Sequence, residues 1–490
     1  MNGFGDSYKK KKNKNTKLSK EQIINQAIKL HLRGNIREAI KFYQQIIKVG
    51  WNDPRVFSNY GIILKDLGNF KEAEISFRKA IELNPNFVEA HSNLGTILKD
   101  LGNLKEAEIS FRKAIELNPN LVKAHSNLGV ILNDLGNLKD AEKSYRKAIE
   151  LNPHLVRAYY LLSRIKYSDE NKIWQDQIFS EDFLMNKSKK EKVDIYFTRA
   201  NILHKRKKYK ESSLYLKLAN NLKLDIYPSN SDNLIKKSKK LFIESDKKEN
   251  QIKEDKSFSE NIFIVGMPRC GSTLVESILS MRNDVYALGE TNFLEESFLE
   301  CDNSNKDMCL AELYRKKLNN KTDLNITTNK NLYNYQYAGI IANQIPNAKI
   351  IHCFRDPLDN IISIYRAHFV NGNQYSSSLV DCAKTYLDQE KIMSEYKTRF
   401  RKKIYDLNYN SLVRNPKKEI KSLLSWLVWE WNDSYLSPHQ NPRSVFTASN
   451  VQVRSPINSQ SIGGWKKYKE MLQPAIEIIT KVDKYRDLVL

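Results

Sequence analysis

A 34-residue repeat fills much of the first half of this chain and limits how it can fold. The stretch NDPRVFSNYGIILKDLGNFKEAEISFRKAIELNP begins at Asn52 and recurs with few changes from Asn86 and Asn120, so the period is 34 residues. Each copy places apolar and small residues at helical spacing on either side of an L-G-N turn, and an N-P pair closes it. The pattern predicts two helices per copy, stacked into a superhelix with a concave face.

In length and pattern the repeat resembles the tetratricopeptide (TPR) repeat. Small residues that would let two helices approach closely recur one period apart: Gly61, Gly95 and Gly129 in the first helix, and Ala73, Ala107 and Ala141 in the second. Weaker copies around Ala27 and Ala200 extend the predicted array over residues 19–226, as about five or six hairpins. Such an array carries no chemistry, so we expect its groove to hold a protein, peptide or glycan.

Composition excludes several classes of function. The net charge of +23 is spread through repeats, linker and tail, so we do not expect a nucleic-acid partner. The 5 cysteines form no C-x-x-C pair and the histidines show no ligand spacing, which predicts reduced thiols, a cytoplasmic location and no metal centre. No apolar run is long enough for a membrane span, and the lysine-rich start lacks the apolar run of a secretory signal.

The remaining boundaries follow from changes in composition. Residues 1–18 are interpreted as a disordered basic tail, and the polar, charge-dense residues 227–260 as a linker with one amphipathic helix. From residue 261 onward, short apolar runs such as IFIVG and AKIIHCF end in turns and are followed by helical patterns. Residues 261–490 are therefore predicted to form a P-loop-like, three-layer α/β domain with a parallel sheet, behind the all-α superhelix.

The turn in IFIVGMPRCGSTLVESIL (residues 262–279) predicts an anion site. Backbone N–H groups of residues 269–273 and the start of a helix would face the anion, and Ser272 and Thr273 add hydroxyl donors. Ser272, however, stands where a nucleotide-binding P-loop has its lysine. An ATP-dependent kinase is therefore disfavoured, because it needs that lysine and a held magnesium ion. A sulfuryl donor, with one negative charge fewer at the reacting end, fits better.

Two motifs about ninety residues apart resemble those of sulfotransferases: MPRCGSTLVESIL the 5′-phosphosulfate loop, and IIHCFRDPLDNIISIYRAHF the 3′-phosphate motif. Together with the repeats they resemble TPR-linked sulfotransferases related to the tyrosylprotein enzymes. The resemblance implies 3′-phosphoadenosine 5′-phosphosulfate (PAPS) as the donor. The donor-binding residues it implies are Arg269, Cys270, Gly271, Ser272, Thr273, Arg355, Ser363, Tyr409, Ser449 and Arg454. Cys270 replaces the usual serine, and Gly464 replaces a basic residue, which leaves Lys466 or Lys467 to substitute.

The same resemblance implies the catalytic residues. Glu290, in the G-E pair of VYALGETNFL, is the expected general base that takes the proton of the acceptor hydroxyl. Lys330 and Arg269 are the expected cations beside the transferring sulfuryl group. Asn329 stands where the family has aspartate, so Lys330 is expected to be held differently.

Two readings of the whole chain remain. The first is a sulfotransferase that moves a sulfuryl group from PAPS to a hydroxyl, with protein tyrosine, glycans and small molecules all open as acceptors. The alternative is a non-enzymatic TPR scaffold with a decayed nucleotide-binding domain. The array itself either captures an acceptor, mediates dimerisation or covers the α/β domain.

Overall fold

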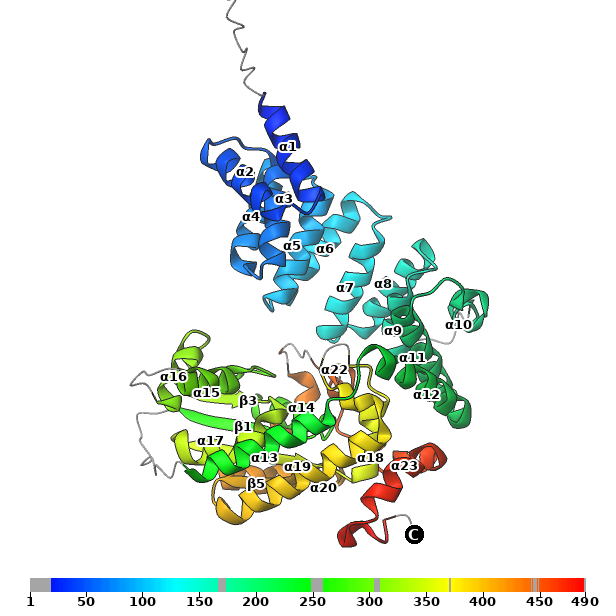
Figure 1. The fold of residues 1–490 in the computed structure, drawn as a ribbon, viewed down its shortest axis with the longest axis vertical. Helices are drawn as coiled ribbons and strands as arrows, with labels where there is room; N and C mark the ends of the chain where they lie inside the picture. Colours follow the sequence, from blue (N-terminus) through cyan, green and yellow to red (C-terminus); the bar gives the residue numbers. More distant parts are fainter. Residues whose placement is uncertain are drawn as a thin grey trace, which may run out of the picture. The chain divides into compact units, whose positions relative to one another are not determined.

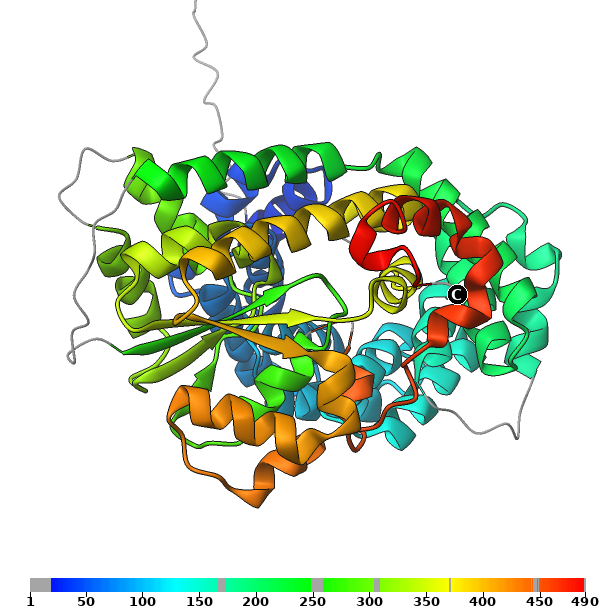
Figure 2. The ribbon, with the colours of Figure 1, turned by 90° about the horizontal axis from the view of Figure 1, so that it is seen from below.

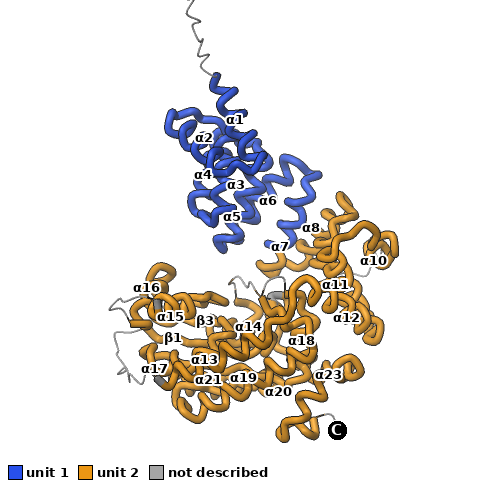
Figure 3. The backbone as a smooth tube through the Cα atoms, viewed as in Figure 1, with its two compact units in different colours: residues 1–131 blue, residues 132–490 orange. Residues whose placement is uncertain are grey.

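The computed structural model of the chain describes residues 19–165, 173–247, 259–303, 309–369, 372–441, 443, 447 and 449–488. The predicted basic tail lies outside these residues. The chain divides into two compact units, residues 1–131 and 132–490 (Figures 1 and 3). The division falls within one helix of the repeat region, so the boundaries expected from composition stay a prediction.

The first unit consists of antiparallel helix pairs. Its helices are α1 (Lys20–Leu32), α2 (Ile36–Lys48), α3 (Pro54–Asp66), α4 (Phe70–Leu83), α5 (Val88–Asp100), α6 (Leu104–Leu117) and most of α7 (Val122–Asp134). A Cβ atom on Gly61 would lie 2.9 Å from the Phe77 ring, so glycine lets α3 and α4 pack closely. The L-G-N turns end each first helix on a glycine with positive φ, for example Gly68 at 81°. The predicted helical array is confirmed.

The second unit continues with helices before its sheet begins. These are α8 (Leu138–Leu151), α9 (Val156–Arg164), α10 (Ile173–Phe179), α11 (Lys189–Lys205), α12 (Tyr209–Ile226) and α13 (Ser231–Lys247). Tyr160, Phe197 and Leu216 of this group share a buried apolar cluster with Ile361 and Leu472 of the α/β domain. These helices and the α/β domain therefore share one core.

Helix α13 lies in the stretch interpreted from its composition as a linker, and it packs on the domain. Leu241 is part of a buried apolar cluster that also contains Phe263 and Val265 of the α/β domain. The Ser238 hydroxyl lies 3.3 Å from the Tyr335 hydroxyl and accepts a hydrogen bond from the Gln336 amide at 2.9 Å. Helix α13 is therefore a packed part of the domain.

The sheet is parallel, in the order β2-β3-β1-β4-β5. Its strands are β1 (Glu260–Gly266), β2 (Val285–Ala287), β3 (Ile326–Asn329), β4 (Ala348–Phe354) and β5 (Ile404–Asn408). The associated helices are α14 (Ser272–Leu279), α15 (Phe293–Asn303), α16 (Leu310–Asn319), α17 (Ala338–Gln344), α18 (Pro357–Tyr365), α19 (Leu379–Arg399), α20 (Tyr409–Arg414), α21 (Pro416–Leu427), α22 (Asn450–Val453) and α23 (Lys469–Ile479).

Helices cover both faces of this sheet, which gives the predicted three layers (Figure 2). Alternate residues of β1 divide between the faces: Phe263 and Val265 pack with α13, α17 and α19. Ile262 and Ile264 pack with α14, α20 and α21 on the other side. Because both faces are buried, the strands read as continuous apolar runs, as the sequence indicated. Ligands of such folds bind at the carboxyl ends of the strands.

Two further observations concern the described ranges alone. None of their helices is both long and apolar enough to cross a membrane. Their histidine, cysteine, aspartate and glutamate side chains form no group of three that could hold a metal ion.

Candidate active site

The turn between β1 and α14 has a backbone that favours glycine at two positions. Gly266 has φ 146°, and a Cβ atom there would lie 2.2 Å from the Cys353 carbonyl oxygen. Gly271 has φ 101°, and a Cβ atom there would lie 2.2 Å from the Tyr409 ring. Gly271 also precedes α14, whose N-terminus has no side-chain cap. The turn therefore presents uncapped helical backbone at the carboxyl edge of the sheet, as an anion site requires.

Cys270 lies inside this turn and faces the interior. Its side chain is buried and contacts the Cys353 thiol. Burial opposes the thiolate, but hydrogen bonds with Cys353 and Ser272 outweigh it and lower the pKa of Cys270. The Cys270 side chain lines neither of the cavities described below, so any contact with the donor would come from its backbone.

A cleft of about 460 Å³ opens beside the turn. Predicted donor-binding residues on its wall are Arg269, Gly271, Thr273, Arg355, Ser363, Tyr409 and Ser449. Lys467 also lines it, next to Gly464, whereas Lys466 does not. Of the two lysines expected to substitute for the missing basic residue, Lys467 is therefore the one that faces the cleft.

Arg355 follows β4 and is held rigidly in this cleft. Its side chain lies 4.9 Å over the Tyr409 ring, and its Nη2 donates to the Ser461 carbonyl at 2.6 Å. The Tyr386 hydroxyl donates to the Arg355 carbonyl at 2.8 Å, which fixes the backbone. Arg355 Nε is buried and has no hydrogen-bond partner among the described residues. A buried, charged donor without an acceptor is costly, so this position suits an anionic ligand.

Arg269 lies within the turn between β1 and α14, and its side chain contacts α18 and the segment around α22. Its guanidinium donates to Ser363 Oγ at 3.2 Å and to Gln452 Oε1 at 3.1 Å, and it also contacts the Ser449 hydroxyl. Burial, together with repulsion from neighbouring arginines, lowers the pKa of Arg269 to about 10. A bound anion would relieve both effects.

A second cavity of about 900 Å³ lies within the same unit. Arg269, Thr273, Ser363 and Ser449 line both this cavity and the cleft. Glu290 lies on its wall, and Arg157, Tyr160, Asn201 and His204 of helices α9 and α11 line it as well. A hydroxyl in this larger cavity could thus approach a group held by the turn between β1 and α14.

Glu290 and Lys330 form an ion pair at the ends of β2 and β3. Lys330 Nζ donates to Glu290 Oε1 at 2.6 Å; the Lys330 side chain is 1% exposed and that of Glu290 52%. Asn329 does not hold the lysine, because its amide donates to the Thr291 and Tyr314 hydroxyls at 3.3 Å each. The carboxylate is open to a substrate while the lysine is fixed behind it.

The structure does not bring Arg454 to the cleft of about 460 Å³. Its guanidinium donates to the backbone carbonyls of Asn441 and Arg443 at 2.6 Å each and of Asp134 at 3.0 Å. Arg454 lines neither cavity. Its contacts are those of a residue that holds the loop before α22 in place.

Several residues of the site escaped sequence reasoning. Gln452 and Ser461 contact Arg269 and Arg355 directly, and Arg366 lines both cavities. Gln452 and Ser461 lie between Ser449 and Gly464, two positions that the resemblance had already assigned to the donor site, so that resemblance was the available signal. Arg366 lies three residues after Ser363, at the C-cap of α18, a spacing that could have identified it.

Comparison with known proteins agrees with this geometry. Residues 261–325 and 307–433 match the sulfotransferase family. Residues 88–121 and 122–155 match the tetratricopeptide repeat, and residues 61–102 match a TPR repeat. The chain therefore carries a sulfotransferase domain together with TPR repeats, and the resemblance noted in the sequence is confirmed.

Relatives share part of the chain. An uncharacterized protein of Aquifex aeolicus (strain VF5) is 30% identical over 266 residues, covering 47% of this chain and 34% of that protein. A protein-tyrosine sulfotransferase of Drosophila melanogaster is 24% identical over 231 residues, covering 42% and 46%. The chain thus spans about a third and about half of the length of these two relatives. A crystal structure of MamA is 26% identical over 28% of this chain and 80% of its own, with a TM-score of 0.27.

Proposed function

We propose that this TPR-containing sulfotransferase moves a sulfuryl group from PAPS to the hydroxyl of a protein acceptor, with tyrosine as the first residue to test. The observation that carries the proposal is the unsatisfied Nε of Arg355, buried in a cleft that adjoins the lysine-free turn. A relative named for protein-tyrosine sulfotransfer supports the choice of acceptor.

The residues of the cleft fit the donor. Arg355 and Ser363 would hold the 3′-phosphate, because a guanidinium binds phosphate through two parallel hydrogen bonds and the hydroxyl adds a third. The turn of residues 269–273 would hold the phosphosulfate through backbone N–H groups, and the Tyr409 ring beside Gly271 would lie near the adenosine. The donor supplies the activated sulfuryl group; the protein supplies its orientation.

Glu290 and the cations around it would carry the transfer. The exposed Glu290 carboxylate takes the proton of the acceptor hydroxyl as the oxygen attacks sulfur in line. Lys330 and Arg269 stabilise negative charge on the oxygen that leaves with the nucleotide. The 2.6 Å contact with Lys330 also fixes where the Glu290 carboxylate lies.

Helices α9 and α11 would help to select the acceptor. Arg157, Tyr160 and Asn201 line the same cavity as Glu290, although they lie outside the residues that match the sulfotransferase family. We infer that an extended protein segment lies in this cavity and is presented to Glu290 from that side. Binding remote from the reacting hydroxyl raises its effective concentration at the base.

The decisive experiment combines labelled PAPS, tyrosine-containing proteins and purified full-length protein. We expect sulfotyrosine in the products by mass spectrometry, and its loss with Glu290→Gln. Label on serine, threonine or glycan would keep the sulfotransferase but change the acceptor. Nucleotide binding without transfer to any component of a lysate would favour the non-enzymatic scaffold.

A further inference from the structure

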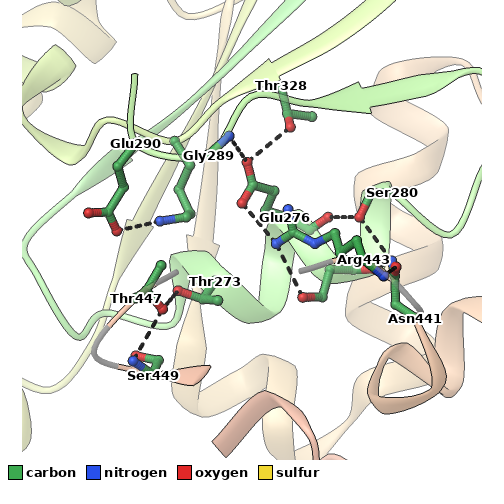
Figure 4. Close-up of polar contacts among 12 residues, drawn as sticks. Thr273, Glu276, Ser280, Gly289, Glu290, Thr328, Asn441, Arg443, Thr447 and Ser449 are labelled. Atoms are coloured by element: carbon green, nitrogen blue, oxygen red, sulfur yellow. Dashed lines mark hydrogen bonds and ion pairs between the residues drawn. The ribbon is translucent and has the colours of Figure 1, made fainter. Parts of the chain in front are cut away.

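Glu276 lies in the interior behind the nucleotide turn, and the proposed function gives it no role. It belongs to α14 and is 1% exposed. Its Oε1 accepts hydrogen bonds from the Gly289 backbone N–H at 3.1 Å and from the Thr328 hydroxyl at 3.2 Å. Its Oε2 accepts from Arg443 Nη2 at 2.8 Å (Figure 4). One carboxylate therefore joins three segments of the domain.

The contacts of Oε1 lead to the catalytic ion pair. Gly289 directly precedes Glu290, and Thr328 lies two residues before Lys330. The Lys330 N–H donates to the Gly289 carbonyl at 2.8 Å, so the two backbones are also joined to each other. Because Glu276 holds both strand ends, it fixes the place from which Glu290 and Lys330 project.

The contact of Oε2 leads to the residues next to the donor turn. Thr447 lies four residues after Arg443, and its hydroxyl lies 3.3 Å from that of Thr273, which precedes Glu276 by three residues on α14 (Figure 4). Ser449, two residues further on, contacts Arg269. The Arg443 side chain is 17% exposed, so its charge faces Glu276 with little competition from water.

A buried charged pair such as Glu276–Arg443 contributes little net stability to the fold. Removing both charges from water costs free energy that the attraction between them often fails to recover, and apolar replacements of similar volume are commonly as stable. Fixed geometry is what a charged, hydrogen-bonded pair supplies and an apolar pair does not.

We propose that Glu276 and Arg443 are positioning residues for the transfer step. Their ion pair sets Glu290 and Lys330, on one side, relative to Thr273 and Arg269 on the other. The inference rests on the proposed function, since those residues are its base, cations and donor turn.

The first test is a double-mutant cycle on sulfuryl transfer to a tyrosine peptide by the full chain. Glu276→Gln keeps the shape of the side chain but removes the charge that faces Arg443. We expect kcat to fall by about 10²-fold, the scale of a small misplacement of reacting groups, with KM for PAPS changed less than about threefold. In a Glu290→Gln background the same substitution should lower kcat by a clearly smaller factor, because the part of its action that passes through Glu290 is already lost. Glu260→Gln, in the partly buried Glu260–Lys349 pair at the start of β1, is the matched control.

Equal fractional losses in both backgrounds would overturn the proposal, since they would indicate a general structural effect. A second measurement does not depend on activity. In the apolar double variant E276M/R443M, the Gly289 N–H loses its acceptor, so hydrogen exchange over residues 285–292 should accelerate by at least about tenfold while thermal stability changes little. Unchanged exchange there would refute the positioning role. If the wild-type protein transfers no sulfuryl group, the proposed function fails, and the exchange experiment still decides whether the pair holds the segment of residues 285–292 in place.

Discussion

Replacing Arg355 with alanine should weaken binding of adenosine 3′,5′-bisphosphate, the desulfated donor, far more than binding of AMP. The guanidinium is already fixed by Tyr409 and Ser461, so little freedom is lost when a phosphate binds. A hydrogen bond to a charged group contributes about 1.5–3 kcal/mol. We therefore expect an increase in Kd of about 10- to 150-fold for the bisphosphate.

Isothermal titration calorimetry without magnesium measures these dissociation constants directly. Each variant is titrated with both ligands, so that the change for AMP can be compared with the change for the bisphosphate. AMP lacks the 3′-phosphate, so its affinity should change less than about threefold on the same substitution. Arg355→Lys keeps the charge but not the planar fork, and should lie between wild type and alanine. Arg414→Ala removes an exposed arginine of α20 and serves as the control for net charge.

Equal losses for both ligands would place Arg355 near the shared 5′ end or in a structural role, and would refute its assignment to the 3′-phosphate. Wild-type affinities for bisphosphate and AMP within about twofold of each other would remove the physical basis for PAPS as donor. Circular dichroism and thermal unfolding of each variant show whether a lost affinity reflects a lost fold.

Three further outcomes are expected. Glu290→Gln should lower kcat by roughly 10²–10⁴ while bisphosphate affinity, measured by calorimetry, stays within about threefold of wild type; full activity would place the base elsewhere. Gly271→Ala should weaken bisphosphate binding in the same assay, because an added Cβ atom would lie 2.2 Å from the Tyr409 ring at φ 101°; unchanged affinity would show that the turn relaxes. Burial lowers the pKa of His204 to about 3, whereas the unfolded chain has a value of about 6.5. Between these two values the unfolded state binds a proton that the folded state does not, so the free energy of unfolding falls as the pH is lowered below about 6.5. Urea unfolding at pH 7.5 and 5.0 should show a loss of up to about 2 kcal/mol that shrinks in His204→Gln; an equal loss in the variant would assign it to other groups.

The sequence predicted those features that depend on local spacing. The 34-residue period identified the helix pairs, and IFIVG followed by glycines identified β1 and its turn, because each pattern is complete within a few residues. Glu290 and Lys330 were predicted separately by resemblance, and the structure joins them in one ion pair.

Long-range pairing and loop direction were beyond such reasoning. Glu276 and Arg443 lie 167 residues apart in the sequence. A glutamate on a helix is expected to face solvent unless a partner for its charge is known. Arg454 lies in a loop with no periodicity to show where its side chain points. In residues 227–260 the sequence indicated an amphipathic helix, but the abundant lysines favoured a linker. The sequence therefore did not show that the face of Leu234, Ser238, Leu241 and Ser245 packs on the domain.

The shared core of the second unit changes how the role of the repeats must be tested. A chain that starts near residue 225 would lack α9, α11 and α12, and would expose Leu358, Ile361 and Tyr365, which those helices bury. Its loss of activity would then report unfolding rather than loss of acceptor capture. A chain that starts at residue 120 removes most of the first unit and keeps this core, so it should retain bisphosphate affinity and thermal stability. If it also keeps full activity on large acceptors, capture belongs to the cavity wall of α9 and α11, and the earlier repeats have another partner. If activity on large acceptors alone falls, the earlier repeats hold the acceptor, and Arg157→Ala should then change KM less than that truncation does.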